Sequence, residues 1–94
     1  MIAIARFQIP LSEAFTFASA AEEALAALAQ CEGFSSGEVG QNTDDPRLWT
    51  LVSIWRDVGS YRRALGKNQV KLVSIPLLAR AIDEPGAYIR PTTE

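Results

Sequence analysis

The chain has 94 residues, 48% hydrophobic and 21% charged, a balance typical of one small globular domain. Nine lysines and arginines against eleven acidic residues give a formal net charge of −2, which argues against general binding to nucleic acid or anionic membranes. The sequence contains no histidine. This absence excludes a Ser-His-Asp triad, a Cys-His pair, a histidine-ligated zinc or haem, and a histidine general base.

Cys31 is the one cysteine, so neither an internal disulfide nor a thiolate metal cluster can form, and we expect no metal site. We expect a small buried hydrophobe at this position, because nothing in the sequence places a cation such as Lys67 or Lys71 beside it. No apolar run approaches the roughly 18 residues that cross a bilayer, and the N-terminus lacks the basic region of a secretory signal. These features predict a cytoplasmic protein.

The chain begins with a predicted strand and a predicted helix. Residues 2–9 are rich in β-branched and aromatic side chains, which favours a strand. Residues 13–31 are rich in Ala, Leu and Glu, with apolar residues at three- and four-residue spacing, which predicts an amphipathic helix. Gly33 lies where a helix commonly ends, and either Ser12 or a capping box from Ser19 could begin it.

A predicted hairpin follows. Residues 34–41 form a strand whose glycines and serines suggest a bend or bulge, and residues 48–55 form the clearest strand in the chain. The turn formers between them include the acidic pair Asp44-Asp45 beside a proline, which we interpret as part of a turn and not as a metal or acid/base site. Two strands joined by a short polar turn most simply pair antiparallel.

The last third predicts two helical segments and a strand. Asp57 is suited to cap a helix over 58–65. A further helix begins near Gln69 and is kinked or divided by Pro76. A final strand is predicted over 87–90, before a frayed polar tail at 91–94.

The predicted element order is βαββαβ, so we expect residues 1–94 to form a single α+β domain. The arrangement is ferredoxin-like, with a four-stranded antiparallel sheet covered by helices on one side. Strand 48–55 carries large apolar residues on both faces: Leu48, Val52 and Ile54 on one, and Trp49, Leu51 and Trp55 on the other. A sheet that is apolar on both sides predicts a homodimer packed sheet against sheet.

The run WTLVSIWRDVGSYRRAL, from Trp49 to Leu65, resembles the antibiotic-biosynthesis-monooxygenase (ABM) domain. The Glu-Gly-Phe that leaves the first helix, Pro-Leu-Leu at 76–78 and EPGAY at 84–88 are similar to other parts of that family, so the likeness runs from Ile2 to Tyr88. The resemblance implies a dimeric α+β barrel with a pocket between sheet and helices in each subunit.

Characterised ABM members include cofactor-free oxygenases acting on aromatic polyketides or quinols, and a haem-degrading branch. The resemblance therefore implies a cofactor-independent monooxygenase of a hydrophobic aromatic, polyketide-like or quinol-like molecule. In such chemistry the ionised substrate supplies the electrons to dioxygen, and the protein binds, orients and stabilises the anion. The alternative is a non-enzymatic dimeric small-ligand-binding or interaction module of the same fold, which the missing histidines favour.

Differences between this sequence and the family pattern narrow the range of activities that the resemblance implies. Relatives often carry a histidine about where Ala64 stands here. The haem-degrading branch needs an asparagine near the first strand, where this chain has Arg6 and Gln8, and a histidine that ligates iron. Because nothing replaces the axial imidazole, haem degradation is disfavoured and no cofactor is expected.

Trp55 and Tyr61 are the candidate catalytic residues and also candidate substrate-binding residues. Trp55 could form a pocket wall that stacks on a planar substrate, or it could be a core or dimer-interface ring. Tyr61 could donate a hydrogen bond to a developing enolate or phenolate, or it could be a buried helix residue with a satisfied hydroxyl.

Arg62 and Asn68 complete the candidate substrate-binding set. Arg62 and Arg63 cannot both face inward on a helix, and a solvated position is the ordinary outcome for each. An inward arginine would stabilise an anionic intermediate. Asn68 follows the end of helix 58–65, where a cap and a pocket mouth can coincide, and capping is its favoured role.

Overall fold

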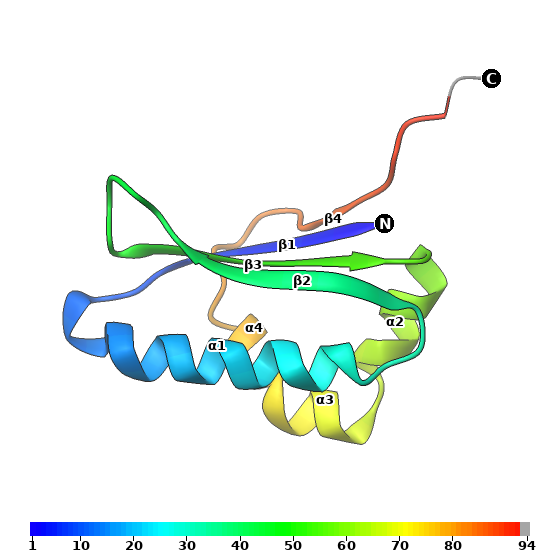
Figure 1. Cartoon of the computed structure of the whole chain (residues 1–94), viewed down its shortest axis with the longest axis horizontal. Coiled ribbons are helices and arrows are strands. Elements are labelled where there is room, and N and C mark those ends of the chain that lie inside the picture. The colour runs from blue at the N-terminus through cyan, green and yellow to red at the C-terminus, as the bar shows by residue number, and fades with distance from the viewer. Residues whose placement is uncertain (93–94) are drawn as a thin grey trace.

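Four antiparallel strands form one sheet, and helices cover one of its faces (Figure 1). The computed structural model describes residues 1–92, so the end of the predicted tail, 93–94, lies outside the described residues. The strand order is β2-β3-β1-β4, as the βαββαβ prediction requires. The strands are β1 (Ile2–Gln8), β2 (Phe34–Gln41), β3 (Leu48–Trp55) and β4 (Ala87–Tyr88).

The helices occupy the predicted segments, with changes at their ends. They are the short 3-10 helix η1 (Leu11–Glu13), α1 (Ala14–Ala29), α2 (Val58–Leu65), α3 (Asn68–Val73) and α4 (Ile75–Leu78). The predicted stripe of α1 is buried, formed by Phe17, Ala21, Ala24, Ala27 and Leu28. Neither predicted start of this helix is correct, because η1 leads directly into α1 and Glu13 stands at its N-cap without a side-chain cap hydrogen bond.

The predicted helix from about Gln69 is divided in two. It begins one residue earlier, at Asn68, and breaks at Ser74, with Pro76 in the first turn of α4. Proline has no N–H for the helical ladder, but the first turn of a helix does not need one. The Ser74 hydroxyl donates to the carbonyl of Ala24 at 2.8 Å, which ties this junction to α1.

The last strand is shorter than the predicted 87–90, for a reason of register. Tyr88 pairs with Ile2 and Ala87 pairs with Ala3. In this antiparallel register Tyr88 already lies opposite Ile2, the first residue of β1, so the strand pairing ends there. The bulge expected in β2 is present, as a register shift between Phe34 and Ser36.

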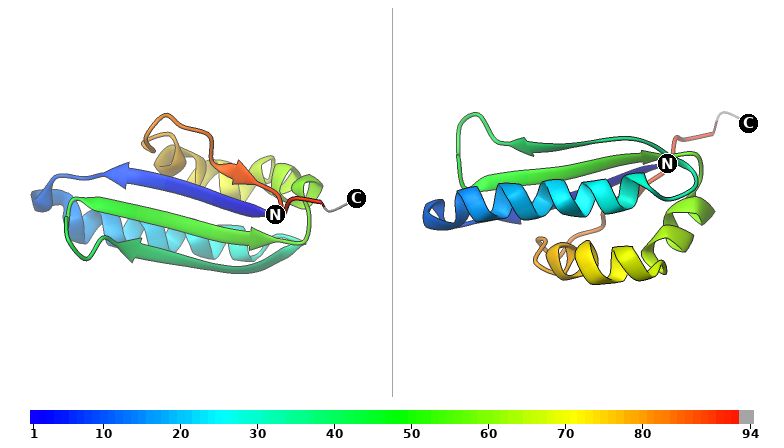
Figure 2. Two further views of the ribbon diagram at one scale, coloured as in Figure 1. Left: turned by 90° about the horizontal axis from the view of Figure 1, so that it is seen from above. Right: turned by 60° about the horizontal axis from the view of Figure 1, so that its bottom comes forward.

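The two faces of the sheet differ as the alternation in β3 predicts. Leu51, Ser53 and Trp55 are buried against the helices. On the other side, Ile2 lies opposite Ile54 and Ile4 lies opposite Val52. We call the surface formed by Ile2, Ile4, Val52, Ile54 and Tyr88 the open face, since within residues 1–92 no helix covers it (Figure 2).

The turn from α1 into β2 depends on Gly33. This residue has φ +90°, and a Cβ there would collide with the side chain of Ser60. We expect Gly33→Ala to lower the free energy of unfolding in urea by about 2 kcal/mol or more, because it combines a left-handed backbone with a steric clash.

Gly66 provides the matched control. It ends α2 with φ −90°, and a Cβ would meet only ordinary contacts. Gly66→Ala should change the unfolding free energy by about 0.5 kcal/mol or less. Equal losses in the two variants would contradict a special role for Gly33.

Candidate functional site

Trp55, the last residue of β3, packs against two other aromatic rings. Its ring centroid lies 5.3 Å from that of Phe34 and 5.5 Å from that of Tyr61, both in edge-to-face arrangements. The indole is 2% exposed, and its Nε1 donates to Ser53 Oγ at 2.8 Å. Of the two roles considered for Trp55, the structure places it in the core, and it lines none of the cavities described below.

Asp57 positions Tyr61 by starting α2 directly after β3. Its carboxylate accepts a hydrogen bond from the backbone N–H of Ser60 at 2.7 Å, which confirms the predicted cap. That bond, the Ser60 hydroxyl and then Arg56 lower the pKa of Asp57 from 3.8 to about 2. The negative charge of Asp57 is also stabilised by the positive end of the helix dipole, which lies at the start of α2. The side chain of Tyr61, one turn along, is thereby directed back toward Trp55.

Tyr61 borders a small cavity between the sheet and the helices. The cavity has a volume of about 40 Å³ and is lined by Ala3, Ile4, Ala5, Leu28, Leu51, Ser53, Tyr61, Leu78 and Gly86. A water occupies about 30 Å³, whereas drug-sized ligands occupy pockets of about 300–1,000 Å³. The cavity therefore holds roughly one water or one oxygen atom of a larger ligand.

Burial raises the pKa of the Tyr61 phenol above its ordinary value of 10.0. The phenol is therefore neutral at physiological pH and is available as a hydrogen-bond donor. Its surroundings are almost entirely apolar, because Ser53 is the only other residue with a polar side chain that lines this cavity in the described chain.

The other candidate residues lie outside this cavity. Arg62 and Arg63 are both exposed, and an Arg63 N–H donates to Ser60 Oγ at 3.3 Å. Asn68 is exposed and does not cap α3, so the favoured capping role is wrong. Lys67 stands at the N-cap, where its backbone is extended, and Asn68 is already the first helical residue. Trp55 and Tyr61 are thus brought together, while Arg62 and Asn68 are not.

Cys31 is half-buried, and its thiol donates to the carbonyl of Ala27 at 3.7 Å. It lines a second cavity of about 110 Å³ with Glu32, Ser60, Arg63, Ala64 and Lys67. Lys67 and Arg63 therefore line one cavity with this cysteine, which nothing in the sequence indicated. Lys67 follows the end of α2 while Cys31 follows the end of α1, and only the packing of these two helices brings them to one cavity.

A larger depression of about 320 Å³ lies on the sheet beside the turn between β2 and β3, lined by Arg6, Gly40, Gln41, Asn42, Leu48, Trp49 and Thr50. Arg6 is its one charged lining residue among those described. Its guanidinium is already bonded at 2.7 and 2.6 Å to the two carboxylate oxygens of Glu84. The depression therefore offers no uncommitted charge to a ligand.

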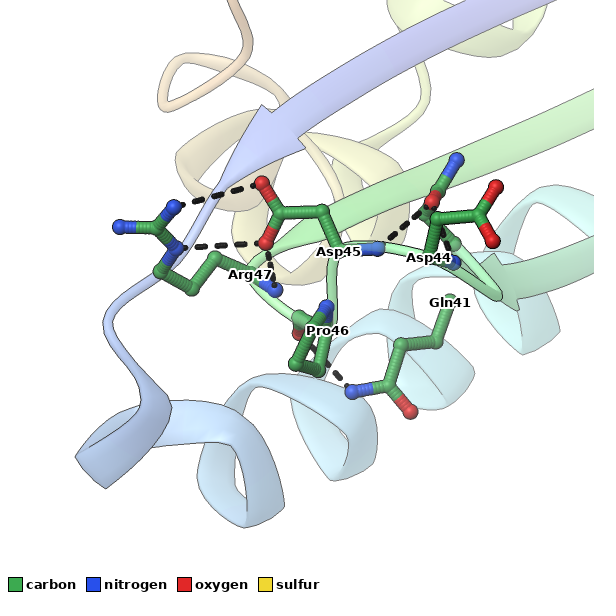
Figure 3. A network of polar contacts seen from close by, with 6 residues as sticks. Gln41, Asp44, Asp45, Pro46 and Arg47 are labelled. Carbon is green, nitrogen blue, oxygen red and sulfur yellow. Dashed lines mark hydrogen bonds and ion pairs between the residues drawn. The ribbon is translucent and has the colours of Figure 1, made fainter.

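The turn between β2 and β3 is held by its own polar side chains (Figure 3). Asn42 Oδ1 accepts hydrogen bonds from the backbone N–H groups of Asp44 and Asp45, each at 2.8 Å. The Asp45 carboxylate accepts from Arg47, whose bonds lower the pKa of Asp45. These acidic residues form a turn, as predicted.

Two general features of the described chain bear on function. Within residues 1–92, no group of three or more His, Cys, Asp and Glu side chains is placed to hold a metal ion. None of the helices in this part of the chain is long and apolar enough to cross a membrane.

Ser53 is not among the residues predicted for the site, although the strand pattern carries a signal for it. Ser53 lies between Leu51 and Trp55 in a strand, and alternation places all three on one face. A hydroxyl on a face that is otherwise buried and apolar needs a partner, which makes it a candidate for a role in the site.

Comparisons with known proteins agree with this fold. A family model described as antibiotic biosynthesis monooxygenase matches residues 1–72. The structure of SnoaB, a cofactor-independent oxygenase from Streptomyces nogalater, is 22% identical with a TM-score of 0.81, covering 98% of this chain and 93% of that chain. No curated protein matches the sequence.

Two further solved structures are similar at lower scores. A conserved protein from Methanosarcina mazei Go1 is 21% identical, with a TM-score of 0.73 over 92% of this chain and 84% of that one. A Deinococcus radiodurans protein, described like the family as an antibiotic biosynthesis monooxygenase, is 16% identical, with a TM-score of 0.72 over 98% of each chain.

The depressed pKa of Asp57 predicts how stability depends on pH. A carboxylate with a folded pKa near 2, against an ordinary 3.8, stabilises the fold above that ordinary value and loses this contribution as pH falls toward 2. Asn also caps helices but does not titrate. We expect Asp57→Asn to melt at a lower temperature than the parent near pH 5, to match the parent only near pH 2 and below, and to show a smaller loss of melting temperature over that range. Parallel melting curves for both proteins would contradict this role of Asp57.

Proposed function

The chain belongs to the antibiotic biosynthesis monooxygenase family, and we propose that it is a cofactor-independent monooxygenase of a hydrophobic aromatic, polyketide-like or quinol-like small molecule. The observation that carries the proposal is the neutral phenol of Tyr61 at an otherwise apolar cavity between sheet and helices. The description of SnoaB as a cofactor-independent oxygenase supports the same reaction class. From the sequence alone, we further propose a cytoplasmic location.

The reaction needs electrons only from the substrate and dioxygen. An anthrone-type substrate loses a proton from its activated CH₂ group and becomes an electron-rich anion, which passes electrons to O₂. One oxygen atom forms the new C=O bond, and the other leaves as water with the two hydrogens of the CH₂ group. The protein contributes by binding the substrate, orienting it and stabilising its anion.

Tyr61 is the proposed group that stabilises the anion. A neutral phenol donates a hydrogen bond to an enolate or phenolate oxygen without itself losing a proton. In an apolar, water-poor environment such a bond is stronger than it would be in water. Trp55 is proposed to support Tyr61 and not to touch the ligand, because the two rings are in contact and the indole does not border the cavity.

A ligand with three fused rings, such as an anthrone, is larger than the cavity of about 40 Å³, so the cavity would have to open, and we propose that it opens on the side of Leu78 and Gly86. The segment between α4 and β4 is held to β1 by the ion pair of Glu84 with Arg6 and by two backbone hydrogen bonds. Ile4 N–H donates to the Gly86 carbonyl at 2.7 Å, and Ile82 N–H donates to the Arg6 carbonyl at 2.8 Å. We propose that displacement of this segment admits the ring system while its oxygen reaches Tyr61.

The alternative is a non-enzymatic dimeric module that binds a small apolar ligand. One observation favours it: within the described chain, no cation lines the Tyr61 cavity, and Arg62 lies exposed elsewhere. An anionic intermediate would then depend on hydroxyl donors alone. Ligand binding without oxygen consumption is the result that distinguishes this alternative.

Oxygen consumption tests the monooxygenase directly. With anthrone- and quinol-type substrates, we expect protein-dependent O₂ uptake, which an oxygen electrode measures. Tyr61→Phe should lower kcat by about 100-fold, since it removes one donor to the developing anion. Tyr88→Phe is the control, because it keeps the ring that Tyr88 contributes to the open face and removes only a hydroxyl that donates to the Pro85 carbonyl. No uptake across a broad substrate panel would sink the enzyme proposal.

We also propose that two copies pack through their open faces. Ile2 and Tyr88 remain 39% and 49% exposed on this face in the single chain, and burying such apolar surface is the main favourable term in association. Light scattering should give about twice the 10.2 kDa of one chain.

A charge in the centre of the open face should prevent this association. Val52→Glu would place its carboxylate beside Glu38, the partner of Val52 across β2 and β3. We expect this variant to be monomeric, whereas Leu72→Glu, at an exposed apolar residue of α3, should stay dimeric. A parent protein that is monomeric at high concentration would refute the interface.

A further inference from the structure

Ser53 is a buried polar residue that lines the same cavity as Tyr61. It lies within β3 on the helix-covered face, is 1% exposed, and lines the cavity. Its Oγ accepts the indole N–H of Trp55 at 2.8 Å. In the part of the chain that the structure describes, no protein acceptor is assigned to the proton of this hydroxyl.

The bond from Trp55 determines what the Ser53 hydroxyl can do. A serine hydroxyl has one proton to donate and two lone pairs that accept. Because the indole N–H occupies one lone pair, the Ser53 hydroxyl still has one lone pair that can accept a hydrogen bond and one O–H group that can donate one. Accepting a hydrogen bond also polarises the O–H group and strengthens the bond that it donates. A buried donor without an acceptor is costly, so an oxygen atom in the cavity would relieve that cost.

The cavity contains little else that could bind a polar group. The other residues that line it, apart from Tyr61, have no polar side chain: Ala3, Ile4, Ala5, Leu28, Leu51, Leu78 and Gly86. Its volume of about 40 Å³ suits a single oxygen atom that enters ahead of a larger ring. Two hydroxyl donors around one such space resemble an oxyanion hole made from side chains.

We propose that Ser53 and Tyr61 jointly donate hydrogen bonds to one carbonyl, enolate or phenolate oxygen of the ligand, and that Trp55 is a positioning residue that orients the Ser53 hydroxyl. The ionisable aromatic nature of the ligand rests on the proposed function. The donor pair itself rests on the cavity and on the bond between Trp55 and Ser53. This role explains how a fully buried tryptophan influences a site that it does not border.

Binding of 4-nitrophenol tests the pair without any need for turnover. The neutral and anionic forms of this phenol absorb at different wavelengths, so its pKa when bound can be measured by titration. Hydrogen bonds to the anion lower that pKa, and loss of a donor raises it. We expect Ser53→Ala and Tyr61→Phe each to raise the pKa of the bound probe by about one unit, a tenfold change in its ionisation constant. Trp55→Phe should raise it by less.

Two controls separate the hydroxyl from its structural effects. Ser53→Thr keeps the hydroxyl, whereas Ser53→Val introduces a side chain of nearly the same shape as threonine but without a hydroxyl. Only the valine variant should therefore raise the pKa of the bound probe. Ser74→Ala removes another buried serine hydroxyl, which is bonded to Ala24 and does not line the cavity. It should lower the melting temperature and leave the pKa of the probe unchanged.

The outcomes distinguish this inference from the proposed function. Equal probe pKa values for Ser53→Thr and Ser53→Val, or failure of the folded parent protein to bind 4-nitrophenol, would overturn the donor pair. Oxygen uptake that is as fast in Ser53→Val as in Ser53→Thr would leave the monooxygenase standing and refute this role of Ser53. A raised probe pKa in Ser53→Val, with no oxygen uptake by any variant, would support the donor pair and refute the monooxygenase.

Discussion

The packing of Trp55 at the end of the central strand is the interaction on which the rest of the structure depends. Its backbone joins three segments, since its N–H donates to the Met1 carbonyl at 2.8 Å and its residue pairs with Phe34 across the sheet. Its side chain contacts Tyr61 of α2 and bonds to Ser53. A buried tryptophan whose N–H is satisfied contributes much apolar burial at no polar cost. The starts of β1, β2 and α2 are therefore held at one place.

This arrangement also sets the chemistry that the cavity can support. The arginines of α2 lie on the outer surface, and Asp57 is used to cap the helix. What remains inside is a neutral phenol, a serine hydroxyl and aliphatic side chains. Such a site can bind a neutral carbonyl or phenol and can favour its anion through hydrogen bonds.

Local patterns predicted the elements well where one signal was strong. The bounds of β3 and α2 are those expected, because strict alternation marks the strand, and a capping aspartate and a glycine mark the helix. The predicted starts at Ser12 and Ser19 and the cap at Asn68 are wrong. Several residues near each helix start could cap, and the path of the backbone, which sequence pattern does not specify, selects among them.

The sequence named Trp55 and Tyr61 as candidates, but it did not show that Trp55 is buried in the core or that Tyr61 borders a cavity. Six positions separate them in the chain, and whether a tryptophan lines a pocket or fills the core depends on what packs against it. Phe34, from the preceding strand, closes one side of the indole. The nearness of Lys67 to Cys31 depends likewise on how α1 and α2 pack. Such contacts join segments that no local pattern relates.

The composition by itself determined that imidazole chemistry is absent, and the alternation of β3 determined that this strand is apolar on both faces. Those properties depend only on which residues are present and on the two-residue repeat of a strand. Only the tertiary structure decided that Trp55 is a core residue and that Ser53 and Tyr61 border one small cavity. The reason is physical: cavity size and the partners of a buried hydroxyl depend on the simultaneous packing of β1, β3, α1, α2 and α4.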